Sequence, residues 1–380
     1  MATTARAYLT GFGRYLPGPP VDNDGMAARL GGDDAVTARI RGSILASNGI
    51  RQRHYALDEQ GEPTELNEEL AVKALTAALD DRGIRPSDLR MLATATTMGD
   101  VLVPGFANMV HGRLGGGPMQ LLSASGVCAS SMAALDAVVS KVRLGDHPRG
   151  AVVASELPSR SLRQRRYEGF RAGMDAHFLR WMLSDGAGAV VVEFQPHPTR
   201  LSLRVDWIRQ VSLAHDHAVC MRAGMSGDET HVGGTWQDVG IADAQAAGMF
   251  VLRQDVGVLD DLAEAGIAQF EELVDIGLVD VHHLDHVICH YSTNVFRDVA
   301  FDALRRRIPS LDTERWFSNL ETRGNTGSAS IFIALEEAWR TGRFAPGETV
   351  LLAVPESGRF SFAFAQLTVV APSQPQGASS

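Results

Sequence analysis

Cys128 is the residue of this chain whose surroundings best suit covalent chemistry. An apolar run over 119–127 precedes it, and the residues after it are apolar at helical spacing, as in Ala129, Met132, Ala133, Leu135 and Val139. We therefore expect Cys128 at the junction of a buried strand and a buried helix. Free backbone N–H groups and the positive end of the helix dipole favour a thiolate there. The same pattern also fits an inert buried thiol, so this stretch alone leaves both interpretations open.

Two polar residues in the second half of the chain could assist a thiolate nucleophile. His290 follows the apolar segment 284–289, and Asn325 lies in the glycine-flanked loop 323–330, just before a helical pattern. An imidazole can accept the thiol proton, and N–H donors can stabilise a developing oxyanion. Ligands of open α/β sheets bind at the carboxyl ends of strands, where both residues are expected. Taken singly, His290 also fits a surface or capping residue, and Asn325 a simple turn.

Alternating strand and helix patterns must position these three residues. The run before Cys128 predicts one strand. Further apolar runs predict a strand that begins at residue 8 and strands at 91–97, 151–155, 185–193, 284–289 and 349–354. Helical periodicity is found after Cys128 and at 68–79, 104–114, 250–273, 295–308 and 328–339. This alternation predicts the α/β class.

The two halves of the chain resemble each other weakly. A glycine, a short turn and a buried strand follow one another after position 83 and again after position 277. We expect a first half at 1–195 that carries Cys128 and a second half at 200–370 that carries His290 and Asn325. The polar tail at 371–380 is expected to be disordered.

Composition excludes several classes of function. The net charge of −10 argues against nucleic acid as a partner, and no apolar run approaches the roughly 20 residues of a membrane helix. The 3 cysteines are far apart and form no CxxC pair, which indicates a reducing cytoplasm. His282, His283 and His286 cluster near His290, but no acidic or cysteine ligands complete a metal pattern, so we expect no metal.

Five segments together resemble the ketosynthase III-type condensing enzymes. They are, in chain order, Gly49–Tyr55, the Cys128 stretch, Ser184–Ala189, His290 and Gly324–Ser328. The resemblance runs from about residue 6 to about 370. It implies a thiolase-like, duplicated, five-layered αβαβα fold, a homodimer, and a cysteine that carries an acyl group as a thioester. It also implies no cofactor besides acyl-thioester substrates of carrier protein or coenzyme A.

The resemblance assigns roles residue by residue. Cys128 would be the nucleophile, while His290 and Asn325 would hydrogen-bond the thioester carbonyl of the second substrate and stabilise the enolate left by decarboxylation. The backbone N–H groups of Cys128 and Gly358 would form the oxyanion hole. In such enzymes the loop before the helix at 104 reaches the partner subunit, so Leu102, Val103 and Phe106 are predicted to shape the acyl pocket.

Departures from the family pattern bear on the substrate. The histidine is followed by Tyr291 rather than the usual Gln-Ala-Asn, and the C-terminal glycine cluster is reduced to Glu356-Ser-Gly358. The aromatic residue that stacks on coenzyme A aligns near Ser43, which cannot stack. An acyl carrier protein is therefore the expected donor, in specialised polyketide or fatty-acid-derived metabolism. Arg160, Arg163, Arg165 and Arg166 are predicted to dock that acidic carrier, although a solvated face is the alternative.

Carbon–carbon bond formation by a decarboxylative Claisen condensation is the predicted reaction, because Asn325 supplies the second donor that decarboxylation needs. The alternatives are transfer of the acyl group to an oxygen or nitrogen nucleophile, and an inactive scaffold that pairs with an active homologue. The intact Cys, His and Asn argue against the scaffold.

Overall fold

The computed structural model describes residues 6–32, 34–227 and 229–372. Most of the predicted tail, residues 373–380, lies outside the described residues. The main sheet has ten strands in the order β12-β11-β13-β14-β8-β1-β7-β6-β4-β5. Its strands are β1 (Tyr8–Tyr15), β4 (Met91–Thr96), β5 (Gln120–Ser125), β6 (Arg149–Glu156), β7 (Gly186–Glu193), β8 (Ser202–Ser212), β11 (His286–Cys289), β12 (Trp316–Phe317), β13 (Thr349–Glu356) and β14 (Ser361–Val370).

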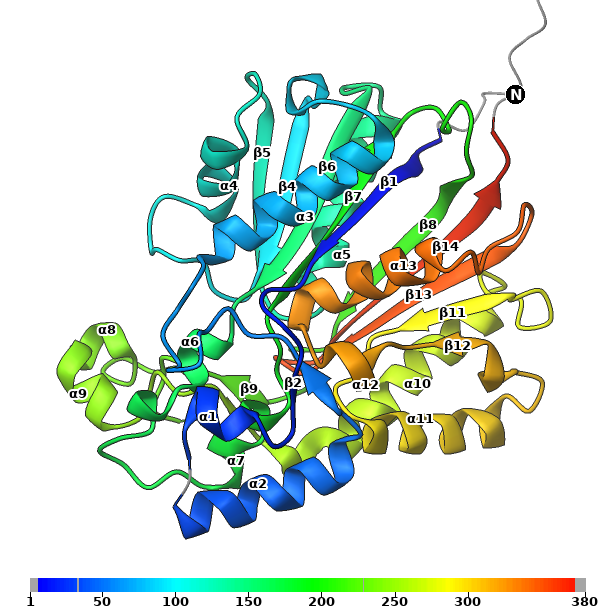
Figure 1. The fold of residues 1–380 in the computed structure, drawn as a ribbon. Helices are drawn as coiled ribbons and strands as arrows, with labels where there is room; N and C mark the ends of the chain where they lie inside the picture. The colour runs from blue at the N-terminus through cyan, green and yellow to red at the C-terminus, as the bar shows by residue number, and fades with distance from the viewer. Residues whose placement is uncertain (1–5, 33, 228, 373–380) are drawn as a thin grey trace, which may run out of the picture.

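The sheet consists of two halves with the same topology. In the first, β1, β7 and β6 are antiparallel neighbours, and β6, β4 and β5 are parallel neighbours. In the second, β8, β14 and β13 repeat the antiparallel part, and β13, β11 and β12 the parallel part. Only Tyr8 and Leu9 of β1 pair with β8, so the halves join at one end and splay apart (Figure 1). The duplicated α/β fold is thus confirmed, while the division into domains at 195–200 stays a prediction.

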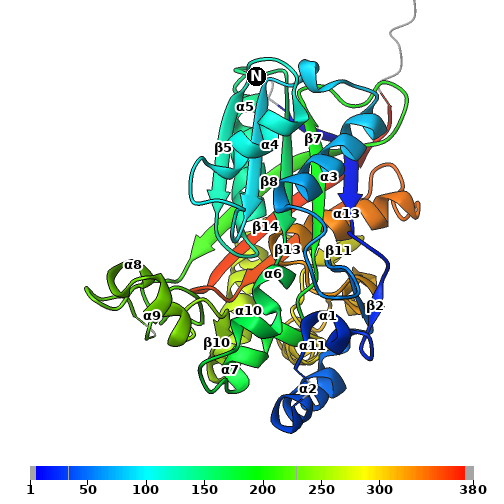
Figure 2. The same cartoon turned by 60° about the vertical axis from the view of Figure 1, so that its left-hand side comes forward.

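Helices fill the space between the two half-sheets and cover their outer faces (Figures 1 and 2). The helices are α1 (Met26–Leu30), α2 (Ala35–Asn48), α3 (Asn67–Arg82), α4 (Phe106–Leu114), α5 (Ser130–Arg143), α6 (Ser159–Leu162), α7 (Met174–His177), α8 (Trp236–Val239), α9 (Ile241–Ala246), α10 (Leu259–Asp275), α11 (Asn294–Arg307), α12 (Leu320–Arg323) and α13 (Ser330–Arg340). Two small two-stranded antiparallel sheets pair β2 (Val21–Asp22) with β3 (Gln52–Arg53) and β9 (Met221–Arg222) with β10 (Arg253–Gln254).

Successive residues of one strand pack into different hydrophobic cores, and this alternation shows the five layers. In β7, Val190 and Val192 pack in the central core with α5 and α13, whereas Ala189 and Val191 pack in the outer core with α3. In β13, Leu352 belongs to the central core and Leu351 to the other outer core, with α10 and α11. Both faces of each half-sheet are therefore covered, which explains why these strands are continuous apolar runs.

Close packing of the central helices depends on a glycine in β7. A Cβ at Gly188 would lie 2.7 Å from the Cβ of Phe332 and 2.9 Å from the backbone N of Ile333, both in α13. Only glycine lets the strand approach this helix so closely. The helix α13 begins directly after the loop that contains Asn325, so this contact helps to position that loop.

Some expectations about elements were wrong. The strand β5 was expected to be buried, but its residues are exposed or half-buried because it is the last strand of the sheet. The helix expected over 250–273 begins only at Leu259, because β10 occupies 253–254. The sequence patterns also missed α2, β8 and β14. β8 is only partly buried, so it has no continuous apolar run.

Candidate active site

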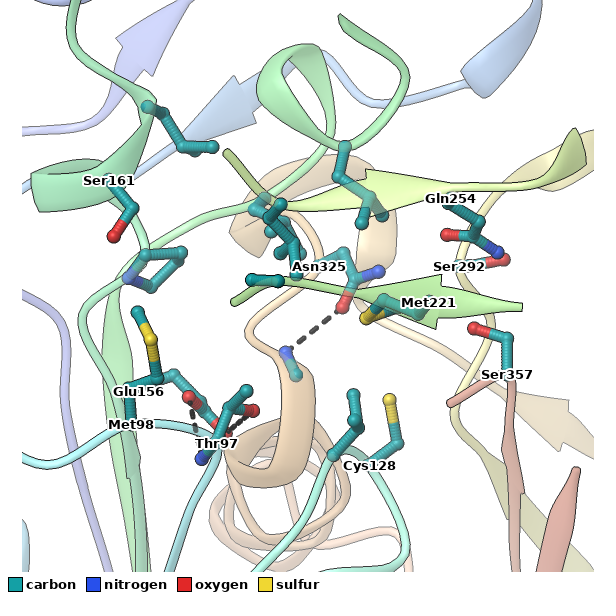
Figure 3. Close-up of a pocket in the computed structure, with 18 of the residues that line it drawn as sticks. Thr97, Met98, Cys128, Glu156, Ser161, Met221, Gln254, Ser292, Asn325 and Ser357 are labelled. Atoms are coloured by element: carbon teal, nitrogen blue, oxygen red, sulfur yellow. Dashed lines mark hydrogen bonds between the residues drawn. The ribbon is translucent and has the colours of Figure 1, made fainter. Parts of the chain in front are cut away.

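The structure brings Cys128, His290 and Asn325 together on the wall of one cavity of about 270 Å³. Cys128 lies just before α5 and His290 just after β11, while Asn325 precedes α13. Figure 3 shows Cys128 and Asn325 with other residues of the wall. Because α5 and α13 occupy equivalent places in the two halves, the duplicated fold points the starts of both helices into the same cavity.

Cys128 and His290 are in hydrogen-bond contact. The Nε2 of His290 lies 3.1 Å from the Sγ of Cys128, and each residue is only 6% exposed. The backbone N–H of His290 donates to the carbonyl of Ala353 at 3.0 Å, which extends the pairing of β11 with β13 and holds the imidazole in place. A thiol and a base at this distance meet the geometric condition for an activated nucleophile.

Burial keeps both partners neutral. Desolvation raises the pKa of the Cys128 thiol well above its ordinary value, and the carboxylates of Glu356 and Glu156 raise it further. Desolvation also lowers the pKa of His290 to about 4. At neutral pH the pair is therefore a thiol that donates to a neutral imidazole. The expectation that the start of the helix favours a resting thiolate was wrong.

Glu356 adds to the effect of burial on the Cys128 thiol. Its Oε2 accepts a hydrogen bond from the backbone N–H of Ala129 at 2.9 Å, so a carboxylate occupies the helix start beside Cys128. A negative charge there opposes a second negative charge on sulfur. The sequence showed Glu356 only as a departure from a glycine cluster, and its contact with α5 depends on the tertiary fold.

The pH dependence of alkylation checks this electrostatic picture. We expect reaction of Cys128 with iodoacetamide to be slow at pH 7 and to keep rising with pH beyond pH 8, because the thiol pKa is raised. Glu356→Gln removes the adjacent charge and should accelerate alkylation at fixed pH by about tenfold for each unit by which the pKa falls. Glu59→Gln, at an exposed position, is the control. A rate that levels off near pH 7 in the unmodified protein would contradict a neutral resting pair.

Asn325 has its side-chain amide oriented by its own loop. Its Oδ1 accepts a hydrogen bond from the backbone N–H of Gly327 at 2.9 Å, drawn as a dashed line in Figure 3. The oxygen is thereby engaged, which leaves the NH₂ group as the donor available to the cavity. Gly324 permits this loop, since it has a φ of 73° and a Cβ there would lie 2.8 Å from the Cβ of Ser184.

Glu156 is a buried acid of the cavity wall that the sequence analysis missed. It accepts a hydrogen bond from the Ser328 hydroxyl at 2.6 Å. It also accepts one from the Thr97 hydroxyl at 2.9 Å, drawn as a dashed line in Figure 3. Burial raises the pKa of Glu156 to about 7, although these hydrogen bonds oppose the rise. Glu156 thus ties the end of β6 to the loop that carries Asn325. Its position at the end of an apolar strand was the available sequence signal.

The predicted oxyanion-hole residue Gly358 does not line the cavity. The preceding residues Pro355 and Ser357 do, and the carbonyl of Gly358 instead accepts from the backbone N–H groups of Cys220 and Met221. Ser357 lines the cavity beside Gly358 and is a second candidate for the partner of Cys128.

The predicted acyl-pocket residues do not line the cavity of their own chain. Leu102 and Val103 are 83% and 82% exposed, so any pocket they shape would belong to another subunit. Phe106 is buried in the outer core with α3 and does not line this cavity. The neighbouring residues Met98, Gly99 and Asp100 do line the cavity.

The four arginines predicted to dock a carrier do not form one surface. Arg163 is buried and donates to the carbonyl of Gly61 and to Glu62. Arg160 pairs with Asp100 at 2.8 Å and lines the cavity. Arg165 is exposed and Arg166 half-exposed, so they are the two members of the set left for docking. A basic run in the sequence does not reveal that α6 turns part of it inward.

Among the residues that the structure describes, no group of three or more His, Cys, Asp or Glu could hold a metal ion. His283 and His286 instead contact Asp280 and Glu348. No helix in the described ranges is long and apolar enough to span a membrane.

Comparison with known proteins agrees with this geometry. Residues 278–363 match the family model described as 3-oxoacyl-[acyl-carrier-protein] synthase III, C terminal. The 3-oxoacyl-(acyl carrier protein) synthase III of Pseudomonas aeruginosa is 22% identical, with a TM-score of 0.72 over 97% of this chain and 99% of that one. OleA of Xanthomonas campestris, solved with lauric acid and lauroyl-CoA, is 15% identical, with a TM-score of 0.76 over 96% and 100%. The priming β-ketosynthase of the R1128 polyketide pathway is 21% identical, with a TM-score of 0.73 over 98% and 99%.

The resemblance to the ketosynthase III-type condensing enzymes is therefore confirmed: the chain has their thiolase-like fold, and residues 278–363 carry the C-terminal domain of that family.

Proposed function

We propose that this protein is a ketosynthase III-like condensing enzyme that forms an acyl thioester on Cys128 and joins it to a second thioester with loss of CO₂. The observation that carries the proposal is the 3.1 Å contact of His290 with Cys128, with the Asn325 amide on the same cavity wall. The solved proteins of this fold include enzymes named for acyl-carrier-protein and polyketide condensation.

The loading step follows from the neutral pair. The Nε2 of His290 takes the proton from the Cys128 thiol as sulfur attacks the carbonyl carbon of the donor thioester. We propose that the backbone N–H groups of Cys128 and Ser357, two residues of the cavity wall, stabilise the tetrahedral oxyanion. The carbon–sulfur bond to the donor then breaks, and the departing thiolate receives the proton from His290. Acyl-Cys128 and a free donor thiol result.

The condensing step uses both side-chain donors. A malonyl-type thioester loses CO₂, and the electron pair of the broken bond moves into an enolate. His290 gave its Nε2 proton to the departing donor thiol, and it exchanges protons with solvent to reach the neutral tautomer that carries the proton on Nε2. The enolate oxygen accepts hydrogen bonds from this Nε2–H and from the NH₂ of Asn325. The enolate carbon attacks the acyl carbonyl, and the Cys128 thiolate leaves and takes one proton from solvent, which balances the carboxylate lost as CO₂. Acyl transfer to a heteroatom needs no enolate donor, so Asn325 favours condensation.

The proposed substrates and partners follow from the cavity and the surface. Cavity residues such as Leu157, Leu162 and Leu252 suit an apolar acyl chain, and no cofactor is proposed. We propose an acyl carrier protein as the donor and Arg165 and Arg166 as part of its docking surface.

We also propose a homodimer. It would pair the open edge of β5 with a second copy and bury the exposed Leu102 and Val103. We place the enzyme in the cytoplasm.

Intact-mass measurement tests the function directly. The enzyme is incubated with a series of acyl thioesters, and we expect the mass of one acyl group to be added, at Cys128. Addition of a malonyl thioester should then discharge this adduct and release one CO₂ for each 3-oxoacyl product. Discharge onto an added alcohol or amine, without release of CO₂, would replace condensation by acyl transfer. Absence of any adduct would contradict both.

A further inference from the structure

The side chain of Gln254 has no role in the chemistry above, yet its burial is unusual. Gln254 is 1% exposed and lies on the cavity wall, and both its Oε1 and its Nε2 are buried without a hydrogen-bond partner among the described residues. The Cys220 thiol lies close enough for the amide to lower its pKa, which burial raises to about 11. Sulfur is only a weak acceptor, and this thiol donates its proton to the carbonyl of Asp255 at 3.4 Å. Oε1 therefore stays unpaired.

Two serines extend this neutral polar region. Gln254, Ser292 and Ser357 lie together on the right of Figure 3, and all three line the cavity. The hydroxyls of Ser292 and Ser357 make no hydrogen bond to any residue that the structure describes, so they are free to bind a ligand. No charged side chain belongs to this group, which we call the amide–hydroxyl cluster.

The cluster adjoins the reacting atoms. Ser292 is two residues after His290, and Ser357 follows Glu356, whose carboxylate binds the residue after Cys128. The strand that carries Gln254 pairs with β9, and the backbone N–H of Met221 in β9 donates to the carbonyl of Gly358 at 3.1 Å. The two-stranded sheet of β9 and β10 is thereby anchored beside the turn that contains Ser357. A group bound by the cluster would lie near the thioester end of a substrate.

A buried carboxamide whose only polar neighbour is a thiol is costly, because its oxygen loses hydration without gaining a donor and its NH₂ gains at most a weak sulfur acceptor. A ligand that hydrogen-bonds both groups of this amide must donate to its oxygen and accept from its NH₂ within the same small space. A ketone or carboxylate only accepts, so either would leave Oε1 unpaired. A hydroxyl group can donate to Oε1 and accept from Nε2 or from a serine.

We infer that the amide–hydroxyl cluster of Gln254, Ser292 and Ser357 binds a hydroxyl group close to the thioester of the acyl substrate, so that the enzyme selects hydroxyacyl over plain acyl groups. This inference rests on the proposed function and names its substrate class. A site built to hydrogen-bond a substrate hydroxyl discriminates strongly against the analogue that lacks it.

Competitive loading tests the inference. The enzyme is offered N-acetylcysteamine thioesters of butyrate together with those of 2-hydroxybutyrate or 3-hydroxybutyrate, and the adducts are compared by intact mass. We expect one hydroxylated group to load at least about tenfold faster than butyrate. Gln254→Met, of similar size but without hydrogen-bonding groups, should abolish that ratio while butyrate still loads. Ser292→Ala should reduce the ratio, and Gln210→Met, on the exposed part of β8, should leave it unchanged.

The other possible results of this experiment decide between the inference and the proposed function. Equal loading of butyrate and both hydroxybutyrates by the unmodified enzyme would overturn the inference and leave the proposed function intact. A ratio unchanged in both Gln254→Met and Ser292→Ala would overturn it as well. If Gln254→Met loads nothing because it misfolds, the Ser292→Ala ratio decides. Loading of no thioester at all would instead overturn the proposed function, and the inference with it.

Discussion

Cys128→Ala should abolish both acyl loading and product formation. The Cys128 sulfur is the atom that His290 contacts, and an alanine at this position leaves no group that could hold an acyl chain as a thioester. Turnover should fall by on the order of 10⁴-fold or more, as when other enzymes lose their nucleophile. The adduct should disappear from the intact-mass spectrum, while circular dichroism shows a folded protein.

The other cysteines provide the control for this result. Cys289 is buried, its pKa is raised to about 12 by desolvation, and it does not line the active-site cavity. Cys289→Ala should therefore load acyl groups as the unmodified enzyme does. Acylation of Cys128→Ala at full stoichiometry would place the nucleophile elsewhere and contradict the proposed mechanism.

Asn325→Ala should reduce condensation by about 100-fold or more and affect acyl loading much less. Loss of one oriented donor to a developing oxyanion typically has an effect of this size, and the enolate forms only after loading. Release of CO₂ from a malonyl thioester and the rate of Cys128 acylation are measured separately. Asn108→Ala, on the exposed surface of α4, should leave both rates unchanged.

A second substitution isolates the donor from the loop geometry. Asn325→Asp keeps an oxygen to accept from the N–H of Gly327 but replaces the NH₂ with an acceptor. It should lose condensation at least as strongly as Asn325→Ala, because a carboxylate would face the developing enolate. Retained decarboxylation in both variants would show that Asn325 acts only in the loop, and acyl transfer to a heteroatom would become the better account.

Much of the site could be predicted from the sequence, because its residues follow local patterns. The apolar runs before Cys128 and His290 predict strands, and glycines flank Asn325, so each residue could be placed at a strand end or a helix start. Repetition of those patterns predicted the duplicated fold, which brings the starts of α5 and α13 to one cavity. Strand and helix periodicity depends on which nearby residues in the sequence are apolar, so it can be read without knowing the tertiary structure.

The electrostatics of the site could not be predicted in this way, because charges act through space. Glu356 lies 227 residues from Ala129 in the chain, yet its carboxylate binds the start of α5 and adds to the burial that raises the pKa of the Cys128 thiol. Arg163 looked like a surface cation until the fold placed it against Gly61 and Glu62.

The hydrogen-bond partners of buried polar groups likewise depend on the tertiary structure and could not be predicted from the sequence. Nothing in the local sequence marks Gln254, whose amide is unpaired because β10 packs its side chain against the cavity rather than against solvent. The desolvation of a polar side chain and its hydrogen-bond partners depend on every chain segment that surrounds it in the folded protein. For this reason the residues expected to act in the chemistry were visible in the sequence, whereas their ionisation and the features expected to select the substrate were not.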